Sequence, residues 1–176
     1  NCRYQWSQRE QVLADLVPKL LTLCLQAKVF KVGLNIDAEE ADRLELSLDI
    51  IEAVLSAPEL AGWDGFGVVV QAYGQRASFV LDWLYGLAVQ CDRRIMVRLV
   101  KGAYWVSEIK RGQVLGLAGF TVFTRKASTD VAYIACAKQL LDMTDRIYPQ
   151  FATHNAHSVA AILKMAEDHT VFEFQR

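Results

Sequence analysis

The sequence has no excess of charge of either sign. Its 176 residues contain 19 Lys and Arg against 20 Asp and Glu, so the net charge is −1 and the pI is about 6.3. Proteins that bind nucleic acids usually concentrate basic charge, so the composition gives no support for a nucleic-acid partner. Apolar residues make up 53% of the chain and charged residues 22%, which is typical of a folded domain with a sizeable core.

Long apolar runs and paired cysteines are also absent. No run approaches the roughly 20 residues that a membrane-spanning helix needs, and the N-terminus shows no signal-peptide pattern. The four cysteines, Cys2, Cys24, Cys91 and Cys136, form no C-x-x-C pair. We interpret them as free thiols in a reducing compartment and expect Cys24 and Cys136 in the core.

Strand and helix patterns alternate regularly along the chain. The predicted strands are 32–37, 66–73, 95–100, 121–126, 150–155 and 170–176. The predicted helices are 7–28, 39–56, 77–90, 107–117, 130–143 and 158–168. Ser7 and Glu10 fit a capping box at the first helix, Pro18 should kink or split that helix, and Phe79 should face the core. Six βα steps predict an α/β fold with a parallel sheet.

Two α/β architectures compete, and the ends of the predicted strands favour one of them. A doubly wound sheet usually has a G-x-G-x-x-G turn after its first strand, and no such turn is present. The polar residues at the strand ends are Asp37; Gln71 and Tyr73; Arg98 and Lys101; Thr124, Arg125 and Lys126; Thr153, His154 and Asn155; Gln175 and Arg176. Active sites of (β/α)8 barrels lie at the C-terminal ends of the strands. We therefore predict an incomplete (β/α)8, TIM-like barrel.

A complete barrel of this kind has eight strands, and about six βα units are recognisable. We therefore expect residues 1–176 to be a fragment of one barrel domain, truncated at both ends.

Arg98 and Asp37 are the first candidates for chemistry. A guanidinium is costly to bury on a strand unless it has a partner. That partner is either an anionic or electron-rich ligand or Asp37, in a structural ion pair. Asp37 could in turn cap the next helix, or it could orient Arg98 and manage a proton. The residues alone leave the role of Asp37 open.

The other strand ends suggest a flat, phosphate-bearing ligand. The turn formed by Lys101, Gly102 and Ala103 could bring the backbone close to a ligand. A second cationic strand end consists of Thr124, Arg125 and Lys126. Tyr104 and Trp105 could stack on the ligand or lie in the core. The Gln71 amide must find partners, which a flavin or nicotinamide edge would supply. His154 and His157 have H-x-x-H spacing without a third ligand, so we expect hydrogen bonding and no metal.

The chain resembles the proline dehydrogenase barrel of the bacterial proline utilization A proteins. The matching runs are LNIDAEEADRLELSLD (34–49), VVVQAYGQRA (68–77), RIMVRLVKGAYW (94–105), SEIKR (107–111), VFTRKASTDVAYIACA (122–137), YPQFATHNAHSVAAI (148–162) and FEFQR (172–176). They cover nearly the whole chain in order. The family binds FAD in a distorted (β/α)8 barrel and oxidises L-proline to Δ1-pyrroline-5-carboxylate by hydride transfer to the flavin.

The resemblance implies a role for each candidate residue. Arg98 would lie near the reactive flavin nitrogen, where a fixed cation stabilises developing negative charge, and Asp37 would be an acid near the active centre. Tyr104 would belong to the substrate pocket. The residues implied to bind FAD are Gln71, Arg98, Lys101, Gly102, Ala103, Trp105, Thr124, Arg125, Lys126, Thr153, His154, Asn155 and Gln175.

The chain departs from the family pattern at two points. Val106 stands where the family usually has Asp, and Asn1-Cys2-Arg3-Tyr4 stands where it has His-Pro-Arg-Tyr. The family's carboxylate-binding arginine pair and a substrate-side lysine fall outside residues 1–176, so we expect the chain alone to be inactive.

The resemblance also implies partners for the parent protein. These are L-proline, a quinone that accepts the electrons, and a Δ1-pyrroline-5-carboxylate dehydrogenase domain in the same polypeptide. The implied location is the cytoplasm, peripheral at the inner face of the membrane. Two alternatives stay open: a Schiff-base lyase or aldolase barrel that uses Lys101 or Lys126, and a barrel fragment without catalysis.

Overall fold

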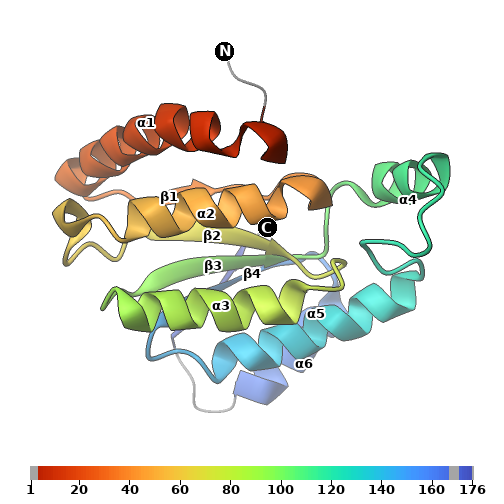
Figure 1. Cartoon of the computed structure of the whole chain (residues 1–176). Coiled ribbons are helices and arrows are strands. Elements are labelled where there is room, and N and C mark those ends of the chain that lie inside the picture. The colour runs from red at the N-terminus through yellow and green to blue at the C-terminus, as the bar shows by residue number, and fades with distance from the viewer. Residues whose placement is uncertain (1–3, 167–170, 176) are drawn as a thin grey trace.

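The computed structural model describes residues 4–166 and 171–175, which form an α/β fold around one parallel sheet (Figure 1). The strands are β1 (Leu34–Ile36), β2 (Phe66–Gln71), β3 (Ile95–Val100), β4 (Ile147–Ala152) and β5 (Glu173–Gln175). The helices are α1 (Arg9–Phe30), α2 (Leu44–Leu55), α3 (Ala77–Gln90), α4 (Trp105–Val114), α5 (Lys126–Leu141) and α6 (Ala156–Ala166). Three 3₁₀ turns complete the fold: η1 (Trp6–Gln8), η2 (Ala41–Arg43) and η3 (Pro58–Leu60).

The order of the strands in the sheet is β1-β2-β3-β4-β5, and every neighbouring pair is parallel. A doubly wound sheet would reverse its strand order at a switch point, and the described strands show no such reversal. Each strand instead lies beside the next one in the chain, as in the wall of a barrel. The carboxyl ends of all five strands therefore lie along one edge of the sheet.

The two faces of the sheet have different surroundings. Ile95, Val97 and Leu99 of β3 are fully buried on the face that the helices cover, and Figure 1 shows α2 and α3 in front of the strands. Met96 and Arg98 alternate with them and are partly exposed on the opposite face. Helix α1 packs outside α2, where Arg9 Nε donates to Asp49 Oδ2 at 2.6 Å.

The strand predicted at 121–126 is wrong. Residues 121–125 belong to the α4–α5 loop and Lys126 begins α5, and the one sheet-like contact of this segment is an antiparallel bridge between Val122 and Gly74. Val122 is fully buried against the β2–α3 loop, and Phe123 N–H donates to Tyr73 O at 2.8 Å. The apolar residues of this segment thus anchor a loop, and β3 pairs directly with β4. The described residues contain five strands where six were predicted.

Several element boundaries also differ from the prediction. Strand β4 begins and ends three residues earlier than predicted, so residues 153–155 follow it as a loop, while α5 begins at Lys126, four residues early. Helix α3 has the predicted bounds, but Phe79 is 73% exposed and the prediction that it faces the core is wrong. Residues 170 and 176 of the last predicted strand lie outside the described residues.

The start of α1 differs as well. No side chain caps it, so the capping box predicted at Ser7 and Glu10 is wrong, and the helix continues unbroken past Pro18. Cys24 and Cys136 are buried free thiols, as predicted, and burial raises the pKa of each to about 11. In the described part of the chain, no helix is long and apolar enough to cross a membrane.

Candidate functional site

A cavity of about 490 Å³ opens at the carboxyl ends of β2, β3 and β4 and beside the residues that follow β1. Nine residues predicted from the sequence line it: Asp37, Gln71, Lys101, Gly102, Ala103, Tyr104, Thr153, His154 and Asn155. We call it the mouth cavity. The polar residues at four successive strand ends therefore meet in one place, as expected for the carboxyl edge of a parallel sheet.

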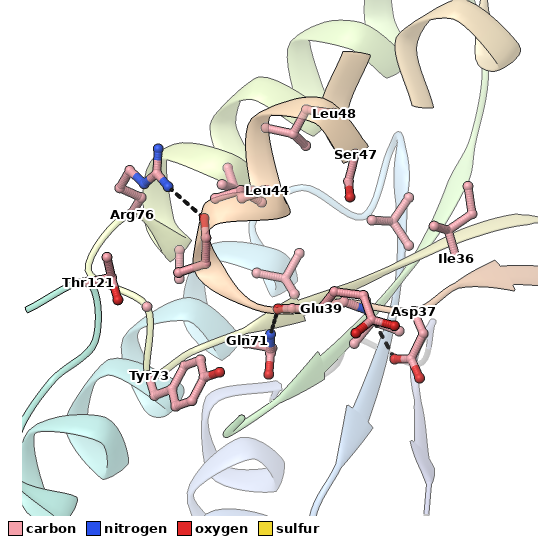
Figure 2. Close-up of a pocket in the computed structure, with 18 of the residues that line it drawn as sticks. Ile36, Asp37, Glu39, Leu44, Ser47, Leu48, Gln71, Tyr73, Arg76 and Thr121 are labelled. Carbon is pink, nitrogen blue, oxygen red and sulfur yellow. Dashed lines mark hydrogen bonds between the residues drawn. The ribbon is translucent and has the colours of Figure 1, made fainter. Parts of the chain in front are cut away.

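A second, smaller cavity of about 80 Å³ lies between the sheet and helices α2 and α3 (Figure 2). Apolar side chains such as Leu44, Leu48 and Val80 line most of it. Asp37 and Gln71 border both cavities. We interpret the small cavity as a gap in helix–sheet packing, because most of the side chains that line it are apolar.

Gln71 joins two loops of the mouth cavity. Its Nε2 donates to Glu39 O at 2.8 Å, as Figure 2 shows, and its Oε1 accepts from Ala103 N–H at 3.0 Å. Backbone groups thus supply partners that we expected from a flavin or nicotinamide edge, and one Nε2 hydrogen has no partner in the described chain. Gln71 therefore fixes the relative position of the loops after β1 and β3.

Arg98 lies in the middle of β3, with Val69 and Gln150 as its neighbours on the adjoining strands. Its Nε is buried and has no hydrogen-bond partner, which is also true of Arg93 and Arg94, although those two donate through Nη2 to Ala57 O and Thr144 O. Among the described residues, Arg98 makes no ion pair with Asp37 or any other carboxylate, and it is not in the lining of the mouth cavity. The structural ion pair that the sequence left open is therefore not found. An unpartnered guanidinium nitrogen is costly to bury, which fits a residue that meets a ligand.

Asp37 does not have the structural role that the sequence left open for it, which was to cap the next helix. Its Oδ1 accepts from the N–H of the next residue, Ala38, at 3.0 Å, and its side chain is exposed. The residue at the start of η2 is Glu40, so Asp37 does not cap the following helical turn. The carboxylate is consequently free to face the mouth cavity.

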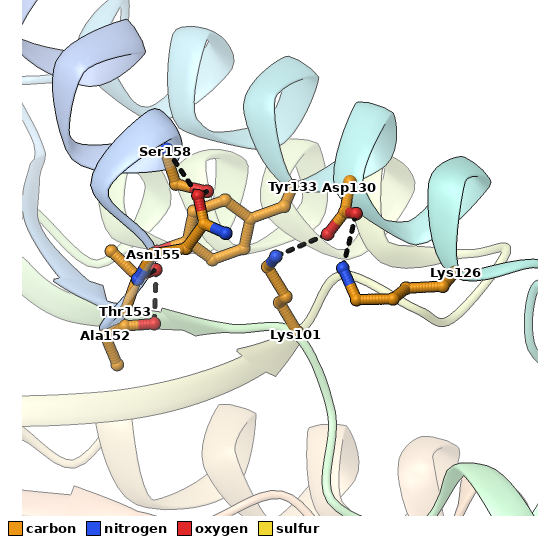
Figure 3. Close-up of polar contacts among 8 residues, drawn as sticks. All are labelled: Lys101, Lys126, Asp130, Tyr133, Ala152, Thr153, Asn155 and Ser158. Carbon is orange, nitrogen blue, oxygen red and sulfur yellow. Dashed lines mark hydrogen bonds and ion pairs between the residues drawn. The ribbon is translucent and has the colours of Figure 1, made fainter.

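Lys101 and Lys126 share one carboxylate, that of Asp130 on the first turns of α5 (Figure 3). Lys101 Nζ binds Asp130 Oδ1, and Lys126 Nζ binds Asp130 Oδ2 at 2.7 Å. The two hydrogen-bonded ammonium groups lower the pKa of the Asp130 carboxyl below its ordinary value. The three groups together carry a net charge of about +1 beside the cavity.

Gly102 allows the loop after β3 to lie against the ring of Tyr73. Its φ is +139°, and a Cβ at this position would lie 2.4 Å from the nearest ring carbon. Tyr73 is 4% exposed, and burial raises its pKa to about 12. The absent side chain of Gly102 thus makes room for the Tyr73 ring, and the approach of this turn to a ligand stays a prediction.

The two aromatic residues after this turn make specific hydrogen bonds. Tyr104 OH donates to Glu39 Oε2 at 3.0 Å, a contact that raises the pKa of the Tyr104 phenol. Trp105 Nε1 donates to Phe123 O at 2.7 Å and ties the α4–α5 loop to α4. Tyr104 lines the mouth cavity, whereas Trp105 is 38% exposed and lies outside its lining.

The remaining predicted residues divide into two groups. Thr153 and His154 line the cavity, and Asn155 lines it while its Oδ1 accepts from Ser158 N–H at 3.0 Å at the start of α6 (Figure 3). Thr124, Arg125, Lys126 and Gln175 are not in the cavity lining, and Gln175 Nε2 donates to Glu173 Oε1 at 2.8 Å. Within the described residues, no group of three or more His, Cys, Asp or Glu is placed to hold a metal ion.

Three carboxylates that organise the site were missed in the sequence. Besides Asp130, Glu108 is 6% exposed and accepts from Ala41 N–H at 2.8 Å and Thr121 Oγ1 at 2.9 Å. Glu173 accepts from Gln150 Nε2 at 2.8 Å. The i,i+4 spacing of Lys126 and Asp130 could have indicated that pair. No local pattern distinguishes Glu108 from an exposed helix glutamate.

Known proteins match nearly the whole chain. The family model described as "Proline dehydrogenase" matches residues 3–176. The Bifunctional protein PutA of Klebsiella aerogenes is 57% identical over 164 residues, which cover 93% of this chain and 12% of the relative. The protein of the same name from Rhizobium meliloti is 54% identical over 175 residues, or 97% of this chain and 14% of the relative.

Solved structures agree with these matches. A crystal structure of a mutant of Bradyrhizobium japonicum proline utilization A has a TM-score of 0.97 and 57% sequence identity, over 99% of this chain and 18% of the other. The structure of proline utilization A from Bdellovibrio bacteriovorus inactivated by N-propargylglycine has a TM-score of 0.90 and 31% identity, over 95% and 18%. The chain thus spans less than a fifth of the length of the relatives described here.

Proposed function

Because the chain belongs to the proline dehydrogenase family, we propose that it supplies the flavin side of an enzyme that oxidises L-proline to Δ1-pyrroline-5-carboxylate. The observation that carries the proposal is the guanidinium of Arg98, which has no hydrogen-bond partner among the described residues, whereas Arg93 and Arg94 each donate through Nη2. Arg98 is not itself in the lining of the mouth cavity, but it lies beside Val69, which is. The names of two similar structures support it, since one has proline bound in remote sites and one was inactivated by N-propargylglycine.

The residues of the site fit a flavin cofactor of the FAD type. Arg98 offers a buried guanidinium nitrogen without a protein partner, and Lys101 contributes a cation at the wall of the cavity. Gly102 and Ala103 place small residues at the wall of the cavity. The residues that would hold FAD are Gln71, Arg98, Lys101, Gly102, Ala103, Trp105, Thr124, Arg125, Lys126, Thr153, His154, Asn155 and Gln175.

When bound, FAD would accept a hydride from proline. The contribution of this chain is electrostatic and geometric. Arg98 presents a fixed positive charge to the negative charge that develops as proline is oxidised, and a preorganised cation does so without reorganisation. Asp37 has no ion-pair partner in the described chain, so it can hold or accept a proton near the substrate. Tyr104, fixed by its hydrogen bond to Glu39, would shape the substrate pocket.

We also propose how the chain fits into a larger protein. Residues 1–176 would form part of a (β/α)8 barrel, with the substrate-carboxylate arginines outside this chain, so the chain alone would be inactive. Electrons would pass to a quinone, and the product to a Δ1-pyrroline-5-carboxylate dehydrogenase domain in the same polypeptide. The protein would work in the cytoplasm, peripheral at the inner face of the membrane.

The Schiff-base alternative receives no support from the surroundings of its two candidate lysines. A nucleophilic lysine needs a desolvated site or a neighbouring cation. Lys101 and Lys126 are near each other, but both contact the Asp130 carboxylate, whose negative charge opposes the activating effect of a neighbouring cation. No contact among the described residues favours a lyase over the flavoenzyme.

The test uses the larger protein of which residues 1–176 would be a part, called the intact protein below, together with FAD and L-proline. We expect a flavin absorbance spectrum that bleaches on addition of proline without oxygen. Arg98→Met should slow this bleaching by about 100-fold or more, because it removes a charge from the developing anion. Arg146→Met is the matched control, since Arg146 pairs with Asp92 on the surface at 2.6 Å and should bleach at the wild-type rate.

Two results would contradict the proposal. The first is intact protein that binds no FAD, and the second is an Arg98→Met variant that binds FAD and reduces it with proline as fast as the wild type. A borohydride-trapped adduct on Lys101 or Lys126 with a carbonyl substrate would instead support the lyase.

A further inference from the structure

We propose, on the basis of the proposed function, that Asp130 is a positioning residue that holds Lys101 and Lys126 in place for an anionic group of the flavin cofactor. Each oxygen of its carboxylate binds one of the two lysines: Oδ1 binds Lys101 Nζ, and Oδ2 binds Lys126 Nζ at 2.7 Å. Lys101 follows β3, whereas Lys126 begins α5, so one carboxylate aligns cations from two elements (Figure 3).

Lys101 is held by a second contact as well. Its Nζ lies 5.9 Å from the ring centroid of Tyr133, which is fully buried. Tyr133 OH donates to Ala152 O at 3.2 Å, at the end of β4. Asp130 on one side and the Tyr133 ring on the other thus restrict a side chain that is otherwise rich in rotamers.

The two lysines differ in how firmly they are fixed. The side chain of Lys101 is 29% exposed and lines the mouth cavity, while that of Lys126 is 78% exposed. Two cations against one carboxylate leave an unbalanced positive charge. Lys101 is therefore a preorganised cation at the cavity wall, and the more exposed Lys126 can turn towards an anionic ligand without leaving Lys101 unpaired.

The arrangement around Asp130 differs from an ordinary surface ion pair. Exposed ion pairs contribute little to stability, and α5 ends with another i,i+4 pair, Lys138 and Asp142, at 3.0 Å. That pair joins neighbours on the surface near the end of the helix, and neither of its members lines the mouth cavity. Asp130 differs because it also reaches a cavity-lining residue from another element. Asp142→Asn is accordingly the matched control.

The first experiment measures the dissociation constant of FAD for the intact protein after removal and return of the flavin. Asp130→Asn should raise the dissociation constant about tenfold, since a charge-assisted contact that orders Lys101 is lost. Asp142→Asn should leave it unchanged, and Asp130→Glu should recover part of the loss. If Asp130 acted only as a repulsive charge near the cofactor, Asp130→Asn would bind FAD more tightly, which would overturn the proposal.

A double-mutant cycle tests whether Asp130 acts through Lys101. In a Lys101→Met background, Asp130→Asn should raise the FAD dissociation constant by clearly less than the tenfold expected in the wild type, because only Lys126 is then left for Asp130 to position. Fully additive losses would overturn the positioning role.

The second experiment needs no cofactor. An N-hydroxysuccinimide ester is applied to the flavin-free intact protein, and the labelling rate of each lysine is followed by mass spectrometry. Lys101 should label several-fold faster in Asp130→Asn than in the wild type, since its ammonium is no longer held against a carboxylate. Lys164 on α6 serves as the internal reference.

The outcomes separate this proposal from the proposed function. Normal FAD binding by the wild type, with no change of affinity or labelling in Asp130→Asn, overturns the role of Asp130 alone. A wild type that binds no FAD overturns the proposed function and, with it, the cofactor that the lysines would meet.

Discussion

Gly102 has a backbone φ of +139°, and the Tyr73 ring lies where its side chain would begin. The sequence suggested that the backbone approaches a ligand at this glycine and gave no sign of the contact with Tyr73, because Tyr73 precedes Gly102 by a whole βα unit. The same limit applies to Arg98. The apolar run around Arg98 was enough to predict a charged residue on a buried strand. The absence of an ion pair between Arg98 and Asp37 could not be predicted, because it depends on how the strands are placed in the fold.

The first residue-scale prediction concerns Gly102→Ala. We expect a loss of about 3 kcal/mol in the stability of the intact protein, because the substitution combines an unfavourable φ with overpacking against Tyr73. Thermal or chemical unfolding of the flavin-free protein measures it. Gly86→Ala is the control, since Gly86 lies inside α3 with open space around it and should gain about 0.5–1 kcal/mol. Equal stability of the Gly102→Ala variant and the wild type would contradict this account.

At the scale of elements, long periodic segments were predicted best. Helix α3 has the predicted bounds, since fourteen residues carry enough periodicity to define it. The segment at 121–126 failed because a short apolar run can pack as a buried loop as well as a strand. Nothing local shows that Val122 is buried against the β2–α3 loop. The distinction depends on β3 pairing with β4, which is a tertiary contact.

The prediction at this scale concerns the C-terminal ends of helices α4 and α1. Helix α4 ends in a Schellman motif in which Leu117 N–H donates to Gly112 O at 3.0 Å and Gly116 has a φ of +61°. Lys31 has a similar φ of 55° after α1, although it carries a side chain. Gly116→Ala should therefore cost about 1 kcal/mol and Lys31→Gly should gain a few tenths or more. Thermal unfolding compares the two, and shifts in the same direction would rule out this explanation.

At the scale of the whole molecule, the sequence predicted the parallel sheet and the meeting of its strand ends. It did so because strands of a parallel sheet read as nearly continuous apolar runs, and the polar residues that follow those runs mark the strand ends. The mouth cavity accordingly contains most of the predicted residues. The sequence could not place the supporting carboxylates, since Glu108 and Asp130 act on partners from other elements. The spacing of apolar residues along the chain gives no information about such contacts.

The proposal that this sheet belongs to a closed barrel predicts a pattern of amide hydrogen exchange. In the chain alone, β2 and β3 have neighbours on both sides, whereas β1 and β5 each pair with one described strand. Amides of β1 and β5 should then exchange about two orders of magnitude faster than those of β3. In the intact protein, further strands would pair with both edges, so β1 and β5 should approach the protection of β3. Hydrogen exchange measured by mass spectrometry on both proteins decides the matter. Edge strands that stay equally unprotected in the intact protein would mean that the sheet is open and that the mouth cavity is the edge of a sheet and not the mouth of a barrel.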